Sequence, residues 1–579
     1  MKYPRVILFI FGLVLSFSVP AFANNLQITN VSLDERRMHS STVLAVVKFD
    51  ISWDSSWRNT TNYDAVWLVF KTCIGSCSQL YTHSLVYTDS IYGVKSSVGT
   101  NEDLEFAGGG TGVTGIFLQR SSSGTGTVSS KDVKVTIAPG ATATQNIIVK
   151  VIGIEMVYIP QGPFYAGDGG SGTTGSLVKT TTTYDPWYIA SEAAIRTTAV
   201  STGSFFYRTG GSSGEFTTGS IFTIPAEFPK GYDAFYCMKY EVTEGQYADF
   251  INSLSTTYQT NRDITSGNGT TTGKGTDNVL KRNTMSISGG TATTSRTDRA
   301  MSWISWADLA AYFDWVGLRP MTELEYEKIA RGDAAALIGE YAWGSSTSIT
   351  AGVTFSGSPE DGNETFTTAS ANANYNVTTF SQGDDFLGTQ YAQGPVRAGI
   401  FAAASSTRTT SGAGYYGPME LSGNVSERVV TIGNTTGTSF FAVNGDGTLN
   451  SLSGYEGNAL QLGWPGTPDY GERGVDGSTG AGAGFKGGHY FVGASYLKIS
   501  DRSQTASNDG FRSASGTSAY GGRGVRSLSP PTLPTCGNET IEPPEQCDTP
   551  QGQWPVTGCP DPMNDTCDPS TCVCVSFAI

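Results

Sequence analysis

Helix-forming signals are confined to three short stretches of this 579-residue chain, and this scarcity limits the possible folds more than any other feature. Each stretch opens on a capping box, in which a hydroxyl residue stands three positions before an acid or an amide. The three boxes are Thr243 with Gln246, Ser305 with Asp308, and Thr322 with Glu325. Glycines follow the second and third stretches, where helices commonly end. A chain with so little helix must build its cores mainly from strands and loops.

The composition is typical of an exported protein built mainly from strands and loops. The chain holds 72 Gly and 15% charged residues, while its 11% aromatic content is enough to bury a sizeable core. Its 36 basic and 51 acidic residues give a net charge of −15, and binding to nucleic acid needs a basic face. We therefore expect several domains and no nucleic-acid partner.

Residues 1–23 have the pattern of a signal peptide. Lys2 and Arg5 precede the apolar stretch 6–17, and Ala21-Phe22-Ala23 is a small-residue cleavage site. A membrane anchor is the alternative, but a membrane-spanning helix needs about 20 apolar residues. No later window is long and apolar enough to cross a bilayer. The expected mature protein is secreted or at the cell surface, without a transmembrane segment.

Residues 24–150 are predicted to form an all-β sandwich. Segment 42–53 ends in strict alternation, which places one set of side chains on one face: Val47, Phe49, Ile51 and Trp53. Segments 63–73, 132–137 and 146–154 are further strand candidates, separated by turn residues. No cluster of acids or nucleophiles accompanies them, so we assign no chemistry to this domain.

Residues 528–579 are predicted to be a linker and a cysteine-rich tail. An exported tail this short cannot build a core, and disulfides are expected to hold it. The candidates are Cys536, Cys547, Cys559, Cys567, Cys572 and Cys574. Their pairing stays open, and a zinc knuckle is the alternative, although the tail has no His. Cys73 and Cys77 can pair across a tight loop, and Cys237 is expected to be a small buried hydrophobe.

Residues 151–527 combine the three helices with short strands and long loops, which gives an α+β fold class. Tracts 200–221 and 262–298 lack periodicity and are expected to lie on the surface. Seven blocks in this segment resemble, in order, those of the formylglycine-generating enzyme (sulfatase-modifying factor) family. The blocks are 155–164, 235–243, 302–308, 317–327, 341–344, 421–427 and 510–512. The resemblance implies a variant C-type-lectin fold, and the tail is similar to a secreted cysteine-rich repeat.

The copper site implied by this resemblance lacks its ligands. The family's oxidase binds copper through two cysteines that lie shortly before its Arg-Ser-Gln and Gly-Phe-Arg blocks. Those blocks are present here from Arg502 and Gly510, but the ligand positions fall at Ala494 and Ile499. No cysteine lies between Cys237 and Cys536, and Cu(I) prefers thiolates. We expect no copper, and a single histidine in this segment also argues against a non-haem iron site.

Two calcium sites implied by the resemblance keep oxygen ligands. The first has the side chains of Asn374 and Asp384 and the carbonyls of Tyr375 and Phe386. The second is composed of Ser422, Gly423, Asn424, Val425 and Glu427. Calcium prefers about six to eight oxygens, including carbonyls, although these Asn and Asp can instead form simple Asx-turns. Ser426 stands where the family usually has Trp. We expect calcium to be the cofactor.

By analogy with the family, stretch 487–513 would line a groove suited to binding. Its candidate contacts are His489, Tyr490, Tyr496, Lys498, Arg502 and Gln504. The alternative is that Tyr490 is core and Arg502 structural. We predict an exported, calcium-stabilised binding or display protein with a glycan or a surface protein as partner. The alternatives are a divergent formylglycine-generating oxidase acting on sulfatase-type cysteine motifs, and a structural envelope or matrix protein.

Overall fold

The computed structural model describes most of the chain between residues 25 and 528, and two short strands of the tail. The described residues are 25–39, 41–75, 80–88, 96–142, 145–199, 205–266, 273–356, 362–380, 393–461, 463–466, 480–512, 519–528, 565–568 and 573–576. The predicted signal peptide lies outside them, as do Cys77, Cys536, Cys547, Cys559 and Cys572. In the tail, β23 (Asp565–Asp568) pairs with β24 (Val573–Ser576), and Cys567 lies opposite Cys574. The disulfides of the tail, and that between Cys73 and Cys77, stay predictions.

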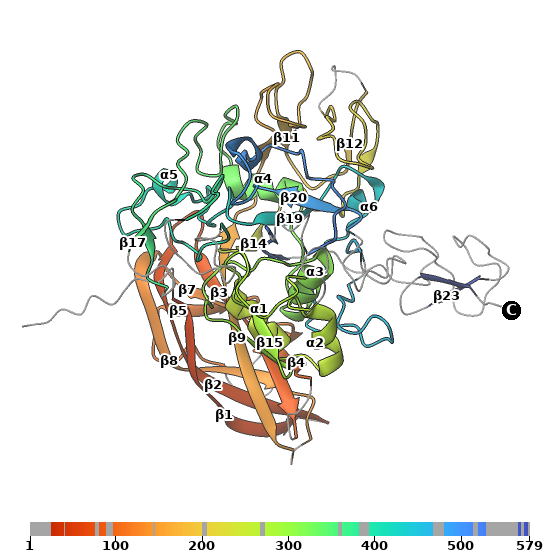
Figure 1. Cartoon of the computed structure of the whole chain (residues 1–579). Coiled ribbons are helices and arrows are strands. Elements are labelled where there is room, and N and C mark those ends of the chain that lie inside the picture. Colours follow the sequence, from red (N-terminus) through yellow and green to blue (C-terminus); the bar gives the residue numbers. More distant parts are fainter. Residues whose placement is uncertain are drawn as a thin grey trace, which may run out of the picture.

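The N-terminal segment folds into two facing layers of antiparallel strands (Figure 1). One layer contains β1 (Gln27–His39), β2 (Thr42–Arg58), β8 (Gly124–Ala138) and β6 (Thr111–Val113). The other contains β5 (Leu104–Ala107), β7 (Ile116–Arg120), β3 (Asp64–Ile74) and β9 (Ile147–Ile159). Strand β4 (Thr82–Tyr87) pairs with both β8 and β3 and so joins the layers. No helix occurs in the described residues of this region, as expected for an all-β domain.

The alternation predicted on β2 is confirmed, and it makes one half of the sandwich core. Val47, Phe49, Ile51 and Trp53 are 0–2% exposed. They belong to the same apolar cluster as Val66, Leu68 and Phe70 of β3. Burying one such side chain stabilises the fold by about 1.5–3 kcal/mol. The two layers are therefore held together by strands whose side chains alternate with a period of two.

Strand β9 connects the sandwich to the rest of the chain. Its Ile147–Val157 portion pairs antiparallel with β3, and Met156–Ile159 pair with β14 (Phe235–Met238). Strand β14 pairs in turn with β22 (Val525–Ser527). One continuous sheet thus runs from the sandwich into the second part of the molecule. The predicted boundary at residue 150 lies inside this strand.

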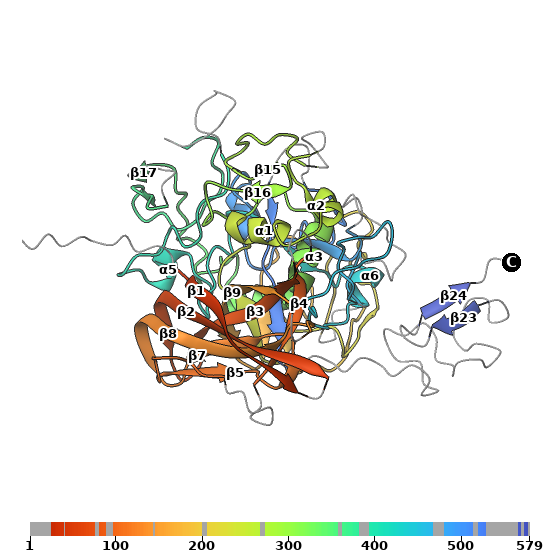
Figure 2. The ribbon, with the colours of Figure 1, turned by 90° about the horizontal axis from the view of Figure 1, so that it is seen from below.

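Strand β3 is buried on both faces because it lies between two cores. Its other face presents Ala65, Trp67 and Val69 to the main cluster of the second part. The indole nitrogen of Trp67 donates a hydrogen bond to the carbonyl of Val316 at 2.8 Å, and the Arg526 guanidinium lies 4.1 Å from its ring centre. Figure 2 shows β3 and β9 between the outer strands and the helices α1 and α3. The second part is thus packed directly on the sandwich.

The three predicted helices are confirmed, with their caps. They are α1 (Glu244–Ile251), α3 (Trp306–Trp315) and α4 (Glu323–Arg331), and each begins at its predicted capping box. Gly317 and Gly332 adopt φ of 72° and 68°, a left-handed conformation that favours glycine. Sequence patterns missed four shorter elements: α2 (Thr256–Arg262), α5 (Arg408–Ser411), α6 (Thr435–Thr438) and the 3₁₀ turn η3 (Ala494–Leu497).

Short strands and long loops make up the remainder of the α+β part. The hairpins are β10 (Phe164–Ala166) with β11 (Trp187–Ile189), β12 (Ile195–Arg196) with β13 (Thr223–Ile224), β15 (Ser286–Ser288) with β16 (Thr291–Thr293), and β17 (Phe355–Ser356) with β18 (Thr365–Phe366). A three-stranded sheet places β19 (Ser426–Val430) between β20 (Ala483–Lys486) and β21 (Tyr520–Gly521). Within the described ranges, no helix is both long and apolar enough to cross a membrane.

The expectation that tracts 200–221 and 262–298 lie on the surface is wrong for several of their described residues. Tyr207, Arg262 and Arg282 are 0% exposed. A buried guanidinium needs partners, and Arg262 forms an ion pair with Asp308 of α3 at 3.1 Å. Hydropathy patterns do not identify such buried loops, because charged residues predict exposure even where their side chains form ion pairs in the interior.

We predict that Trp67→Ala destabilises the sandwich and the second part together. Truncating a buried aromatic costs about 3–5 kcal/mol, and here it also removes the hydrogen bond to Val316. Urea unfolding followed by far- and near-ultraviolet circular dichroism should show one transition, shifted to lower urea. Met38→Ala on the exposed side of β1 is the control and should leave the midpoint almost unchanged. Two separate transitions in the wild type would contradict the shared sheet.

Candidate functional site

The loop that follows β20 contains the predicted groove residues. Two backbone hydrogen bonds fix its position: Val377 N donates to Tyr490 O at 2.9 Å, and Ile499 N donates to Glu340 O at 2.9 Å. Tyr341 and Trp343, whose rings stack 5.1 Å apart, share an apolar cluster with Leu497. The loop therefore rests on two other loops, and its Ile499 also packs in an apolar cluster with residues of helix α4.

Only some of the predicted groove residues are accessible. His489, Tyr490 and Arg502 are buried, at 5%, 1% and 0% exposure. Tyr496 is 39% exposed, while Lys498 and Gln504 are half-buried. Burial lowers the pKa of His489 to about 4, so its imidazole is neutral at physiological pH. The loop thus exposes Tyr496, leaves Lys498 and Gln504 partly accessible, and buries His489, Tyr490 and Arg502.

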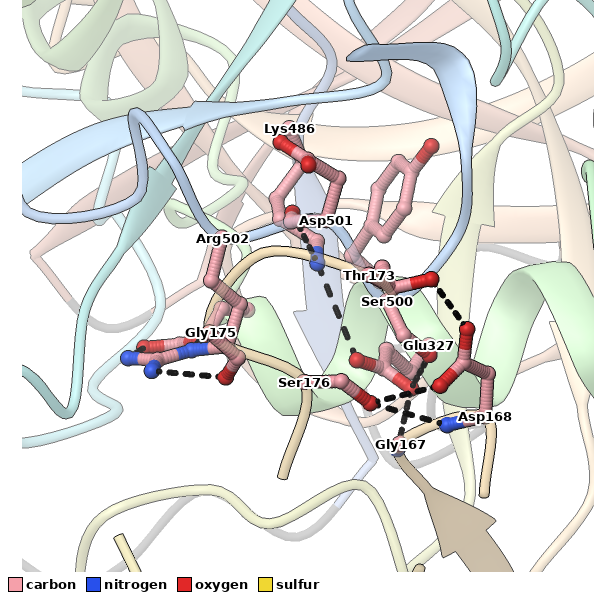
Figure 3. A network of polar contacts seen from close by, with 12 residues as sticks. Gly167, Asp168, Thr173, Gly175, Ser176, Glu327, Lys486, Ser500, Asp501 and Arg502 are labelled. Atoms are coloured by element: carbon pink, nitrogen blue, oxygen red, sulfur yellow. Dashed lines mark hydrogen bonds and ion pairs between the residues drawn. The ribbon is translucent and has the colours of Figure 1, made fainter. Parts of the chain in front are cut away.

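Arg502 belongs to a buried polar network, and Figure 3 shows its guanidinium beside Gly175. Its Nε donates to Glu323 Oε2 at 2.6 Å and its Nη2 to Glu323 Oε1 at 3.2 Å, a bidentate pair with the first residue of α4. Its Nη1 donates to the carbonyl of Arg208 at 2.8 Å, and its Nη2 also donates to the Tyr207 hydroxyl at 3.1 Å. Burial raises the pKa of Glu323, but the adjacent guanidinium outweighs it and holds that pKa below its ordinary value. Arg502 therefore fixes loops to α4.

A second part of the network holds Lys486 in the interior. The ammonium of Lys486 donates to the carbonyl of Asp501 at 2.9 Å and lies 3.7 Å from the carboxylate of Glu327. Burial lowers the pKa of Lys486. Glu327 also accepts hydrogen bonds from the hydroxyl of Ser500 at 3.0 Å and from Gly167 N at 2.7 Å. Each charge in this cluster already has an internal partner.

Asp168 organises the loop beside this network. Its carboxylate accepts hydrogen bonds from the hydroxyls of Thr173 and Ser176 and from Gly339 N, the latter two at 2.8 and 2.9 Å (Figure 3). These bonds close the turn that contacts Arg502 through the carbonyl of Gly175. The arrangement shapes the floor under the groove loop.

The positions implied for copper cannot bind it. Ala494 begins η3, and Ile499 is fully buried in an apolar cluster. Cys237 is buried on β14, where its thiol contacts the carbonyl of Met238 and burial raises its pKa. In the described part of the chain, no three His, Cys, Asp or Glu side chains converge as a metal site. The donor set for a thiolate-bound copper is therefore missing.

The first predicted calcium site is described in part, and this part fits calcium. Asn374 is buried, and its Nδ2 donates to the carbonyl of Gly394 and to Asn424 Oδ1, both at 3.1 Å. Its Oδ1 is buried without a hydrogen-bond partner among the described residues. An unpaired buried amide oxygen is costly, and a hard cation would compensate it. The other side-chain ligand, Asp384, and the carbonyl of Phe386 lie outside the described residues.

In the second predicted calcium site most side-chain atoms have other partners, although Glu427 Oε2 is buried without a hydrogen-bond partner among the described residues. Glu427 Oε1 accepts from Arg523 at 2.7 and 2.5 Å. Asn424 donates to Glu241 at 2.5 Å and accepts from Val396 N at 2.9 Å. A guanidinium already neutralises the carboxylate that would have to bind the ion. Sequence reasoning missed Arg523, and the only local signal for it was a lone Arg in a Gly-rich segment.

Buried carboxylates surround Arg523. Burial raises the pKa of Glu241 and Glu427, and raises that of Glu420 to about 7. Glu420 Oε1 accepts from Gly399 N at 2.9 Å, whereas its Oε2 has no partner among the described residues. Arg397 and Lys239 add positive charge near Glu420, but burial outweighs them and favours its neutral form.

These features agree with a comparison against protein families. The model of the sulfatase-modifying factor enzyme 1-like domain matches residues 150–528, which confirms the resemblance seen over 151–527. This chain belongs to that family. A comparison with curated proteins gives no match. Its sulfatase-modifying factor domain has Ala494 and Ile499 at the positions implied for the copper ligands.

We predict a pH-dependent contribution of Glu420 to stability. Its folded pKa, about 7, exceeds the ordinary value of 4.5, so the protonated form is favoured in the folded state. The resulting stability is full below pH 4.5 and is lost as the pH rises to about 7. Relative to Glu420→Gln, the wild-type free energy of unfolding should fall by on the order of 1 kcal/mol per pH unit in this window.

Urea melts at pH 5, 6, 7 and 8 provide the measurement. Glu102→Gln, at an exposed turn of the sandwich, removes the same charge and serves as control. Equal pH slopes for the wild type and Glu420→Gln would show that Glu420 is ionised in the folded protein throughout this range.

Proposed function

We propose that this chain is an exported binding protein whose sulfatase-modifying factor domain serves as a calcium-stabilised scaffold. The observation that carries the proposal is the replacement of both copper-binding positions, by Ala494 and Ile499, in a loop whose packing residues are retained. Conversion of cysteine to formylglycine needs an oxidising centre, and fold alone does not supply one.

The accessible part of the groove region has the chemistry of a contact surface. We define the recognition surface by Leu337, Ile338, Phe491, Tyr496 and Lys498. The first four are 43%, 60%, 45% and 39% exposed. The aliphatic chain of Lys498 lies over Gly339, next to Ile338 in sequence, about 3.5 Å from where a β-carbon would stand. Exposed aromatic and aliphatic side chains on well-anchored loops are typical of protein interfaces.

The partner favoured by this surface is a protein displayed on another cell or on the same envelope. Four of its five side chains are apolar, and the charged groups nearby, Arg502 and Lys486, are bound internally. A glycan would need more free hydrogen-bonding groups than this surface offers. The signal peptide expected from the sequence supports display outside the cell.

Calcium binding by the first site is part of the proposal and can be tested by chelation. We expect calcium to raise the midpoint of thermal unfolding, because ligand bound only to the native state stabilises it by about 2.7 kcal/mol at a hundredfold excess over Kd. Asp384→Ala should remove most of this shift, whereas Glu102→Ala should keep it. Identical melting curves with calcium and with chelator in the wild type would refute the calcium assignment.

Binding through the recognition surface is tested with an array of surface proteins and glycans. Alanine at Tyr496 or Lys498 should weaken binding to a protein hit at least tenfold, with a change in stability of less than about 1 kcal/mol. Gln504→Ala tests whether the contact extends past Arg502, and Met38→Ala is the control for surface truncation.

A parallel assay follows conversion of a Cys-x-Pro-x-Arg peptide to formylglycine. The proposal predicts no product. Formylglycine formation together with no hit on the array would overturn the binding function in favour of the oxidase. Binding unaffected by alanine at Tyr496 and Lys498 would show that the recognition surface is wrongly placed.

A further inference from the structure

A second concave site lies between the N-terminal strands and α1, and it shares no residue with the groove loop. Its volume is about 770 Å³. Its walls are formed by residues 25–27, by Gly153 and Glu155 of β9, by the face of α1, and by residues 292–298 after β15. Figure 2 shows α1 and β16 stacked over β9. We call this site the junction cleft.

The size and place of the junction cleft are those of a ligand site. Pockets for small molecules typically measure about 300–1,000 Å³ and often lie where two structural units meet. Here the units are joined by the continuous sheet through β9, so both walls are fixed by backbone pairing. Asn252, which caps the C-terminus of α1, also exchanges two hydrogen bonds of 2.8 Å with the backbone of Ala292. The cleft therefore exists before a ligand arrives.

Two buried arginines form the far wall and are themselves held in place. Arg296 pairs with Asp298 at 3.1 Å and with Glu364 at 2.6 Å. Arg397 donates through Nε to the carbonyl of Glu364 at 2.9 Å. Its Nη2 has no hydrogen-bond partner among the described residues. One rigid donor is thus available at this wall.

Other polar groups of the cleft are exposed or only half-buried, so a ligand can reach them. They are the hydroxyl of Tyr240, the amide nitrogen of Gln246, the carboxylate of Asp249 and the hydroxyl of Thr297. Gln246 uses only its Oε1 in the capping box of α1. Together with Arg397 they offer both donors and acceptors, and they come from three separate segments of the chain.

We propose that the junction cleft binds a short, neutral saccharide. Each sugar hydroxyl both donates and accepts, which suits a wall where a carboxylate, an amide and hydroxyls alternate. The Tyr240 ring and Met238 add a small apolar face for the sugar C–H groups. The wall carries charges of both signs, from Glu155, Asp249 and Asp298 and from Arg296 and Arg397, so neither a strongly anionic nor a strongly cationic ligand is favoured. This site is independent of the recognition surface.

The test uses the full mature chain and an array of neutral oligosaccharides, followed by titration calorimetry with the strongest hit. Asp249→Asn and Tyr240→Phe should each raise the Kd at least tenfold. Tyr188→Phe, at an exposed tyrosine of β11, is the matched control and should leave the Kd unchanged. Tyr496→Ala should also leave it unchanged, which separates this site from the recognition surface.

Thr297→Val is a second test variant, chosen because it should not disturb folding. This residue lies on a loop wall of the cleft, and its side chain has no partner to lose in the described structure. A fivefold or greater loss of affinity with an unchanged melting curve would support the cleft. The proposal is overturned if the wild type binds no oligosaccharide at millimolar concentration. It is equally overturned if binding is lost in Tyr496→Ala but kept in Asp249→Asn and Thr297→Val.

Discussion

Backbone pairing along β9 is the constraint on which the rest of the structure depends. Met156 and Val157 have strand partners on both sides, since β3 lies on one edge and β14 on the other. Their neighbours alternate between cores: Ile154 and Met156 join the main cluster, whereas Val149 and Val151 contact the sandwich core. A shift of β9 by one residue would reverse these faces and expose both cores at once. The register of β9 thus fixes how the sandwich packs on the second part. It thereby also fixes the walls of the junction cleft.

Buried guanidinium–carboxylate pairs hold the loops in place, as the backbone hydrogen bonds of helices and sheets do elsewhere. Asp308 of α3 pairs with Arg512 at 2.7 Å, and Glu323 of α4 pairs with Arg502 at 2.6 Å. Glu427 of β19 pairs with Arg523 at 2.5 Å. Removing one partner of such a pair costs about 3–5 kcal/mol, because the other charge stays buried. Three short elements therefore anchor long stretches of irregular chain.

The sequence allowed prediction of features whose causes are local. Each capping box joins residues three positions apart, and the alternation of β2 is read within a single strand, so both were found. The ion pairs join residues 96 to 204 positions apart in the sequence, and no local sequence pattern predicts them. For the same reason Arg502 was placed among groove contacts, although Glu323 holds it in the interior. Tyr496 is exposed and Lys498 half-buried, and their role as binding contacts stays a prediction.

These contacts also explain the structural role of two blocks of the family signature. The Arg-Ser-Gln and Gly-Phe-Arg blocks supply Arg502 and Arg512, which hold α4 and α3 in place. Loss of either arginine would cost several kcal/mol, so folding alone is enough to retain both. Ala494, by contrast, lies half-buried at the start of η3, and its methyl side chain forms no ion pair. Ile499 even gains apolar burial at the position of the second ligand. Ala494 and Ile499 at the positions implied for the copper ligands are therefore compatible with the fold, and the surviving blocks have a structural role in the scaffold.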